Sequence, residues 1–222
     1  MNKNITLIKK KIIEVETIFF DLDGVLIDTE KLYFRFWKEA CLFYGFTLSD
    51  EDALSLRSRD AEDAKAFFNV IFDNKLDYYV AREKRIELMN EYFKTHPIEL
   101  KSGAIAILTK LKQDNKKLYI VTANKVDKAS KIMDSLHING YFENIISAKN
   151  VERGKPFPDV YLKACAFVNK EPKDVIVFED SPNGLKASHA AGCFTVMVED
   201  LTPYTEDMDY VDGAISSLNE LL

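Results

Sequence analysis

The sequence predicts an α/β fold: a doubly wound, mostly parallel sheet with an α-helical domain inserted after its first strand. Two observations support this prediction. Beyond residue 97, short apolar runs alternate with helical segments, the pattern of parallel strands joined by crossover helices. Between an earlier apolar run at residues 18–20 and that region, residues 29–97 show helical patterns and no convincing strand. The helical block is therefore interpreted as an insertion into the sheet domain.

The elements follow in chain order. Residues 18–20 are an apolar strand that runs directly into acidic residues and a glycine. In the insertion, helical patterns cover residues 30–44, 50–72 and 76–94, and Pro97 ends them. Beyond Pro97 the predicted helices cover residues 103–115, 125–136, 158–168 and 183–191, and the predicted strands cover residues 118–122, 144–147, 175–178 and 193–198.

These elements divide the chain into three parts. Residues 1–14 are predicted to be an N-terminal extension, for which the sequence reveals no role. Residues 15–28 and 98–222 are predicted to form the core domain, and residues 29–97 a helical cap. We expect the cap to lie over the carboxyl ends of the strands, where open α/β sheets place their sites.

Composition excludes several classes of function. The hydrophobic share of 47% and the charged share of 30% are ordinary for a globular protein, and the net charge of −6 disfavours nucleic acid and anionic membranes as partners. Cys41, Cys165 and Cys193 are far apart among apolar neighbours, which indicates buried thiols rather than a disulfide or zinc site. No stretch has the pattern of a signal peptide or a membrane span. We expect a cytoplasmic monomer with a small-molecule substrate.

Carboxylates follow two of the predicted strands. Asp21 and Asp23 follow the first strand and precede Gly24, while Glu179 and Asp180 end the strand that begins at residue 175. Either pair alone is compatible with a strand that ends in a solvated turn. If both strand ends meet at one edge of the sheet, however, four carboxylates converge, and a cation is needed to offset their repulsion. Mg²⁺ is the natural candidate, because it binds a few carboxylate oxygens and keeps positions for water and phosphate.

Two further strand ends carry complementary groups. Thr122 ends a strand just before a helix, where a hydroxyl and backbone amides favour an anion, although a threonine there is commonly a simple helix cap. Lys155 is held in extended backbone by the following proline, although a single lysine is usually a surface charge. In chain order the strand ends thus supply acids, a hydroxyl, a cation and a second acidic pair, the groups that phosphoryl transfer needs.

This arrangement resembles the haloacid dehalogenase superfamily of phosphotransferases. The segment from Asp21 to Val25 resembles its first motif, Thr122 the second, Lys155 the third and the Glu179–Asp180 pair the fourth. Order and spacing agree over residues 17–198. Residues 21–30 and 178–184 resemble the β-phosphoglucomutase-like branch with a helical cap, which contains both phosphatases and phosphomutases.

The resemblance implies a mechanism. Asp21 would be the nucleophile that forms an aspartyl-phosphate, and Asp23 the general acid and then base. Mg²⁺ would be held by Asp21, the main-chain carbonyl of Asp23, Asp180 and, with a smaller contribution, Glu179. Further residues implied to contact the phosphoryl group or the substrate are Thr122, Lys155, Ala123 and Asn124. Thr29 would be the hinge between cap and core, unless it only caps the first cap helix.

Two other functions use some of the same residue types. Dehalogenation in this superfamily does without the second aspartate and without Mg²⁺, so Asp23 disfavours it. A phosphoacceptor signalling domain also uses aspartate, threonine and lysine on a doubly wound sheet, but it lacks the helical insertion and the second aspartate. A lasting aspartyl-phosphate without turnover would identify such a domain.

The two activities that are hardest to distinguish are those of a phosphatase and of a β-phosphoglucomutase-type phosphohexomutase. A mutase needs a cap that binds a second phosphate and excludes water. Arg57 and Arg59 lie where mutases of this branch place a phosphate-binding arginine, although both could be solvated. Tyr33 occupies the position where such mutases commonly have histidine, and tyrosine cannot readily replace it as a proton switch near pH 7. We therefore predict a Mg²⁺-dependent phosphatase of a small phosphorylated metabolite, with a sugar phosphate favoured.

Overall fold

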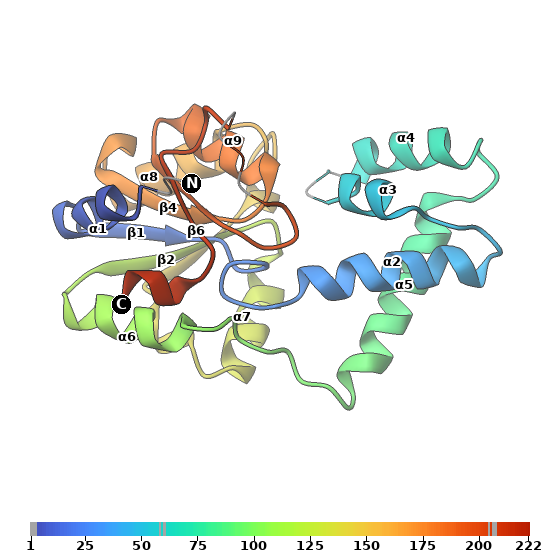
Figure 1. Ribbon diagram of the computed structural model, residues 1–222, viewed down its shortest axis with the longest axis horizontal. Coiled ribbons are helices and arrows are strands. Elements are labelled where there is room, and N and C mark those ends of the chain that lie inside the picture. The colour runs from blue at the N-terminus through green and yellow to red at the C-terminus, as the bar shows by residue number, and fades with distance from the viewer. Residues whose placement is uncertain (1–3, 58, 60, 204, 206–207) are drawn as a thin grey trace. The chain divides into compact units, whose positions relative to one another are not determined.

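The computed structural model describes residues 4–57, 59, 61–203, 205 and 208–222. It divides into two compact units, one of residues 1–28 and 99–222 and one of residues 29–98. The first unit contains the sheet and the second is helical (Figure 1). None of the described helices is long and apolar enough to cross a membrane.

A single six-stranded parallel sheet forms the centre of the first unit, in the order β3-β2-β1-β4-β5-β6. The strands are β1 (Thr17–Phe20), β2 (Lys117–Thr122), β3 (Asn144–Ser147), β4 (Val175–Glu179), β5 (Phe194–Val198) and β6 (Gly213–Ile215). The chain steps outward from β1 to β3 and then returns to β4 on the other side of β1, so the sheet is doubly wound. The predicted fold class is confirmed. The structure adds β6, which the sequence did not predict, because three residues are too short for an apolar pattern.

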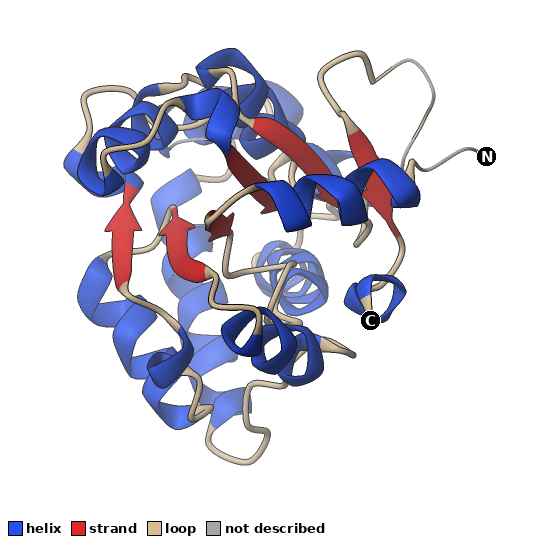
Figure 2. Ribbon diagram, turned by 90° about the vertical axis from the view of Figure 1, so that its left-hand side faces the viewer, coloured by secondary structure: helices blue, strands red, loops and turns tan. Residues whose placement is uncertain are grey.

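Helices cover both faces of this sheet (Figure 1, Figure 2). The α-helices of the first unit are α1 (Ile5–Glu14), α6 (Ala104–Gln113), α7 (Val126–Ser135), α8 (Asp159–Val168) and α9 (Pro182–Ala191), and short 3₁₀ turns occur at Asn139–Tyr141, Ala148–Asn150, Pro172–Asp174 and Leu218–Leu221. Figure 1 shows α8 and α9 on one side of the strands and α6 and α7 on the other. The four helices predicted beyond residue 97 match α6 to α9 to within two residues at each end.

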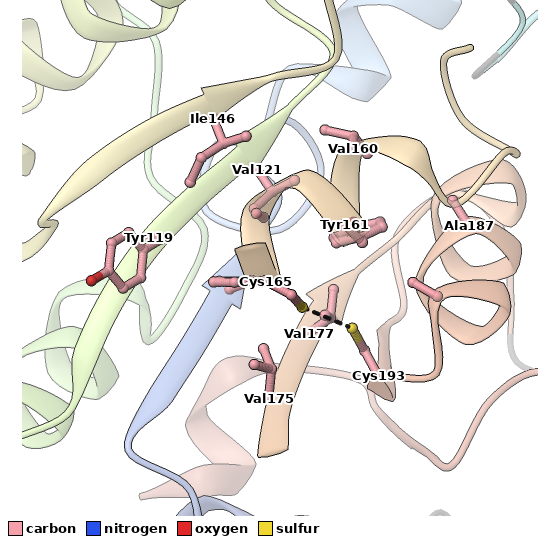
Figure 3. Packing of buried hydrophobic residues seen from close by; sticks show 13 residues of the cluster. Tyr119, Val121, Ile146, Val160, Tyr161, Cys165, Val175, Val177, Ala187 and Cys193 are labelled. Atoms are coloured by element: carbon pink, nitrogen blue, oxygen red, sulfur yellow. Dashed lines mark hydrogen bonds between the residues drawn. The ribbon is translucent and has the colours of Figure 1, made fainter. Parts of the chain in front are cut away.

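The core under α8 and α9 is closely packed (Figure 3). Its β-branched and aromatic side chains from β1, β2 and β4 are buried against the two helices, and Tyr161 is among the largest side chains with no exposed surface. The three cysteines are buried free thiols, as expected, and the Cys165 and Cys193 sulfurs lie 3.9 Å apart in this cluster. Close packing on this face fixes α8 relative to the carboxyl end of β4.

The N-terminal segment forms α1, to which the sequence assigned no role. Its Ile8 and Ile12 side chains are buried, and the helix contacts β6. Beyond it, Glu16 forms ion pairs with Lys117 and Lys170 at the start of the sheet. Hydrogen bonds and charge from these lysines lower the pKa of Glu16 to about 2.

The second unit contains α2 (Glu30–Phe43), α3 (Asp50–Ser55), α4 (Ala61–Ile71) and α5 (Tyr78–Phe93). A hydrophobic core surrounds Trp37 and Phe68. The single helix predicted over residues 50–72 is wrong, because α3 and α4 are separate. The break allows Leu56 and Phe68 to enter the same core from two segments.

Candidate active site

The predicted site residues of the first unit follow neighbouring strands at one edge of the sheet. Phe20 of β1 pairs with Ile120 of β2 and Phe178 of β4, so the residues that follow these strands emerge at the same level. The Asp21 amide extends this pairing by donating to the Phe178 carbonyl at 2.9 Å. Asp21 is thereby held at the centre of the edge, where it is only 7% exposed.

Lys155 connects two of the predicted carboxylates. Its ammonium donates to Asp21 Oδ1 at 2.6 Å and also forms an ion pair with Glu179 Oε1. Burial alone would lower the pKa of Lys155, but the charges of Asp21 and Glu179 outweigh burial and raise it well above its usual value. Lys155 is therefore a buried permanent cation and not the surface charge that a single lysine usually is.

Glu179 is surrounded by donors. Its Oε2 accepts from the amides of Asp180 and Ser181, both at 3.0 Å, and from the Ser181 hydroxyl at 3.1 Å. Its Oε1 accepts from the Tyr161 hydroxyl at 3.1 Å, besides Lys155. This fully buried carboxylate therefore fixes the position of the Lys155 ammonium.

Tyr161 is a site residue that sequence reasoning missed. It lies in the first turn of α8. Its place on the apolar side of the helix that follows Lys155 was the sequence feature that could have identified it. Gly184 was missed as well. A Cβ at this position would lie 1.8 Å from Glu179 Oε1, so only glycine leaves room for the carboxylate.

Asp23 lies beside residues that follow β2. Asn124 Nδ2 donates to Asp23 Oδ2 at 2.5 Å, and the Asn124 amide donates to the Thr122 hydroxyl at 3.1 Å. Thr122 is 1% exposed, whereas Ala123 is exposed. Ser147, at the end of β3, fixes this segment by donating to the Asn124 carbonyl at 2.5 Å. Asn124, predicted as a substrate-binding residue, thus contacts the second aspartate directly.

The electrostatics of Asp21 favour a bound cation. Burial raises the pKa of Asp21 to about 8, Lys155 opposes this rise, and the charges of Glu179 and Asp23 add to it. Additional positive charge would favour the carboxylate form near neutral pH.

The residues present fit Mg²⁺. No group of three or more acidic, histidine or cysteine side chains is placed to bind a metal within the described ranges. Mg²⁺ does not require one, since it is usually held by one or two carboxylates together with water and phosphate. Gly24 has a φ of +78°, and a Cβ there would lie 2.3 Å from Asp180 Oδ2, so the Asp180 carboxylate lies directly against the loop that carries Asp21 and Asp23. Asp21, Asp180 and the Asp23 carbonyl would be hard oxygen ligands.

The other predicted site residues lie in the helical unit. Thr29 is buried and precedes α2, where its carbonyl accepts from the amides of Leu32 and Tyr33 at 3.0 Å. The Arg85 guanidinium lies over the Tyr33 ring at 4.8 Å.

The two arginines predicted for phosphate binding make ion pairs within the helical unit. Arg57 pairs with Glu30 at 2.8 Å, with its side chain only 5% exposed, and Arg59 pairs with Asp63 at 2.8 Å. Arg59 also lies over the ring of Phe67.

Comparison with known proteins identifies the family. The family model of haloacid dehalogenase-like hydrolases matches residues 18–198. A validoxylamine A 7'-phosphate phosphatase of Streptomyces hygroscopicus subsp. limoneus is 32% identical over 80% of this chain and 82% of its own, and a β-phosphoglucomutase of Bacillus subtilis is 29% identical over 83% of each. A crystal structure of a family IA hydrolase from Entamoeba histolytica superposes with a TM-score of 0.76 and 26% identity, covering 92% of this chain and 94% of that one. The chain belongs to the haloacid dehalogenase-like hydrolase family and is an enzyme of its β-phosphoglucomutase-like branch of phosphatases and phosphomutases.

Proposed function

We propose that this enzyme is a Mg²⁺-dependent phosphoric monoester hydrolase that acts on a small phosphorylated metabolite, with a sugar phosphate favoured, through an aspartyl-phosphate on Asp21. The observation that carries the proposal is the position of Asp21. It lies buried at the centre of the sheet edge, paired with Lys155, while Asp23 lies two residues later beside Asn124. A buried carboxylate, a permanent cation and a second acid are the groups that such a transfer needs.

The reaction divides into two displacements. In the first, a carboxylate oxygen of Asp21 attacks phosphorus, the ester P–O bond breaks, and Asp23 gives its proton to the leaving alkoxide. In the second, Asp23 takes a proton from water, the water oxygen attacks phosphorus, and the bond to Asp21 breaks to release phosphate and the free carboxylate.

The remaining groups stabilise the phosphoryl oxygens. Lys155, held by Glu179, supplies a fixed positive charge next to Asp21. The Thr122 hydroxyl and the Ala123 amide would donate to the same oxygens. Mg²⁺, held by Asp21, Asp180 and the Asp23 carbonyl, would supply further positive charge against the phosphoryl oxygens and the crowded carboxylates.

A phosphomutase is the second candidate, because the Bacillus subtilis relative is a β-phosphoglucomutase. Two features of the helical unit favour hydrolysis instead. Arg57 and Arg59, the candidates for a second phosphate site, each pair with a carboxylate of their own unit. Tyr33, which lies under Arg85, does not provide the proton switch that we expect of a mutase.

The test combines variants with a product assay. The enzyme is incubated with Mg²⁺ and a panel of sugar phosphates, and both free phosphate and isomerisation of β-glucose 1-phosphate are followed. We expect phosphate release that Asp21→Asn and chelation of Mg²⁺ abolish, while Asp127→Asn, an exposed aspartate on α7, retains activity. Activity of Asp21→Asn, or activity that is unchanged by chelation, would contradict the mechanism.

Two further outcomes identify the rivals. Isomerisation that outruns phosphate release would assign the enzyme to the mutases. An aspartyl-phosphate that persists without turnover would indicate a phosphoacceptor domain.

A further inference from the structure

The amide side chain of Asn124 lies between two charged groups. Its Nδ2 is 2.5 Å from Asp23 Oδ2, and its Oδ1 is 2.9 Å from the ammonium of Lys128, which is exposed on α7. An ammonium can only donate hydrogen bonds, so the amide atom that faces Lys128 must be the oxygen. Lys128 thereby determines the orientation of the amide, and the NH₂ group must face Asp23.

The backbone of Asn124 is fixed as firmly as its side chain. Its N–H donates to the Thr122 hydroxyl at 3.1 Å, and its carbonyl accepts from the Ser147 hydroxyl at 2.5 Å. These contacts connect Asn124 to the ends of β2 and β3, two neighbouring strands of the sheet. Contacts within the fold, and not a substrate, therefore position the amide donor.

We infer that Asn124 is a positioning residue for the proton that Asp23 transfers, and that Lys128 supports it. This inference rests on the proposed function. An N–H donor that faces Oδ2 occupies one lone pair of that oxygen and favours it as the accepting carbonyl oxygen of the acid, so the proton is favoured on Oδ1. Asn124 thus fixes the plane of the carboxyl group and selects the oxygen that gives the proton to the leaving group and later takes one from water. Fixed orientation of a reacting group is a recognised source of rate enhancement.

This role differs from the substrate binding predicted for Asn124 from the sequence. A residue that binds the phosphoryl group should affect all phosphate esters of similar shape equally. A residue that positions the acid should matter most when the leaving group is a strong base and needs the proton. Phenyl phosphate and 4-nitrophenyl phosphate make this comparison, because they have similar shapes but phenolate needs the proton more than 4-nitrophenolate.

The experiment measures kcat/KM for both esters, because this ratio reports the step in which Asp21 is phosphorylated and the leaving group departs. For Asn124→Ala we expect kcat/KM to fall about tenfold more on phenyl phosphate than on 4-nitrophenyl phosphate, a part of the ~10²–10⁴-fold that acid catalysis contributes. Lys128→Met should lower the ratio of kcat/KM on phenyl phosphate to kcat/KM on 4-nitrophenyl phosphate by about threefold. Lys131→Met, one turn further along α7, should leave the ratio unchanged.

Two outcomes would overturn the inference. An equal fall on both esters would make Asn124 a binding residue, and an unchanged kcat/KM for both would remove it from the reaction. Lys128 is exposed, so Lys128→Met keeps the test decisive even if Asn124→Ala does not fold.

The variant Asp23→Asn separates a failure of the positioning role of Asn124 from a failure of the proposed function. If Asp23→Asn leaves the ratio between the esters unchanged, Asp23 is not the acid and the proposed mechanism fails. If Asp23→Asn lowers the ratio and Asn124→Ala does not, only the positioning role is refuted.

Discussion

The hydroxyl of Tyr161 offers a sharp test of how the buried ion network contributes to stability. It donates to Glu179 Oε1 at 3.1 Å, and neither residue has any exposed surface. Burial raises the pKa of the Tyr161 hydroxyl well above its ordinary value, so the group remains a donor at working pH. Tyr161→Phe keeps the ring in the core and removes this one donor from a buried carboxylate.

The magnitude follows from the charge of the acceptor. A hydrogen bond to a charged group contributes about 1.5–3 kcal/mol, and a bond between neutral groups about 0.5–1.5 kcal/mol. Glu179 keeps its contacts to Lys155 and Ser181, so the carboxylate is weakened but not left unpaired. We expect Tyr161→Phe to lower the free energy of unfolding by about 1.5–3 kcal/mol.

The matched control is Tyr141→Phe, in which a hydroxyl 3.0 Å from that of Thr109 is lost in the same unit. Urea unfolding followed by far-UV circular dichroism measures both variants. Tryptophan fluorescence would be a poor probe, because Trp37, the single tryptophan, lies in the helical unit. A loss of less than about 0.5 kcal/mol for Tyr161→Phe, or a loss no larger than that of Tyr141→Phe, would show that the Tyr161 hydroxyl does not stabilise the Glu179 carboxylate.

Two further variants test the surroundings of the site and the start of the sheet. Gly184→Ala places a Cβ 1.8 Å from Glu179 Oε1. We expect the free energy of unfolding in urea to fall by about 1–3 kcal/mol and phosphatase activity to fall as well. Unchanged stability and activity would show that Glu179 can move. Glu16 has a pKa of about 2 in the folded protein, below its ordinary value of 4.5, so its stabilising effect is present above pH 4.5 and is lost as the pH falls toward 2. Glu16→Gln should therefore lower the Tm slightly at neutral pH, and the difference should vanish toward pH 2; a difference that does not change with pH would contradict the assignment.

Local sequence patterns predict most helices and strands of the core domain. They do not predict a very short strand or a helix boundary that depends on side-chain packing. The strands and helices beyond residue 97 were predicted because each carries several apolar residues at a regular spacing. β6 has only three residues, and the separation of α3 from α4 depends on how their side chains enter the core around Phe68. Neither feature leaves a periodic signal in the sequence.

The roles assigned to Thr29, Tyr33, Arg57 and Arg59 stay predictions. In the structure, both arginines pair with carboxylates of the helical unit, and Tyr33 lies under Arg85. The sequence does not predict the pairing of Arg57 with Glu30, because the two residues are 27 positions apart and meet only through the packing of the helical unit.

The order of residues along the chain is enough to predict which chemical groups gather at the site. Parallel strands place their carboxyl ends at one edge, so acids, a threonine and a residue such as Asn124 that follow consecutive strands must converge there. The pairing of these groups follows from the packing of the folded chain, which places Lys155 between Asp21 and Glu179, and Asn124 against Asp23. These partners are far apart in the sequence. Their atoms meet at hydrogen-bonding distance because the packing of whole helices and strands sets the final positions, which no local spacing encodes.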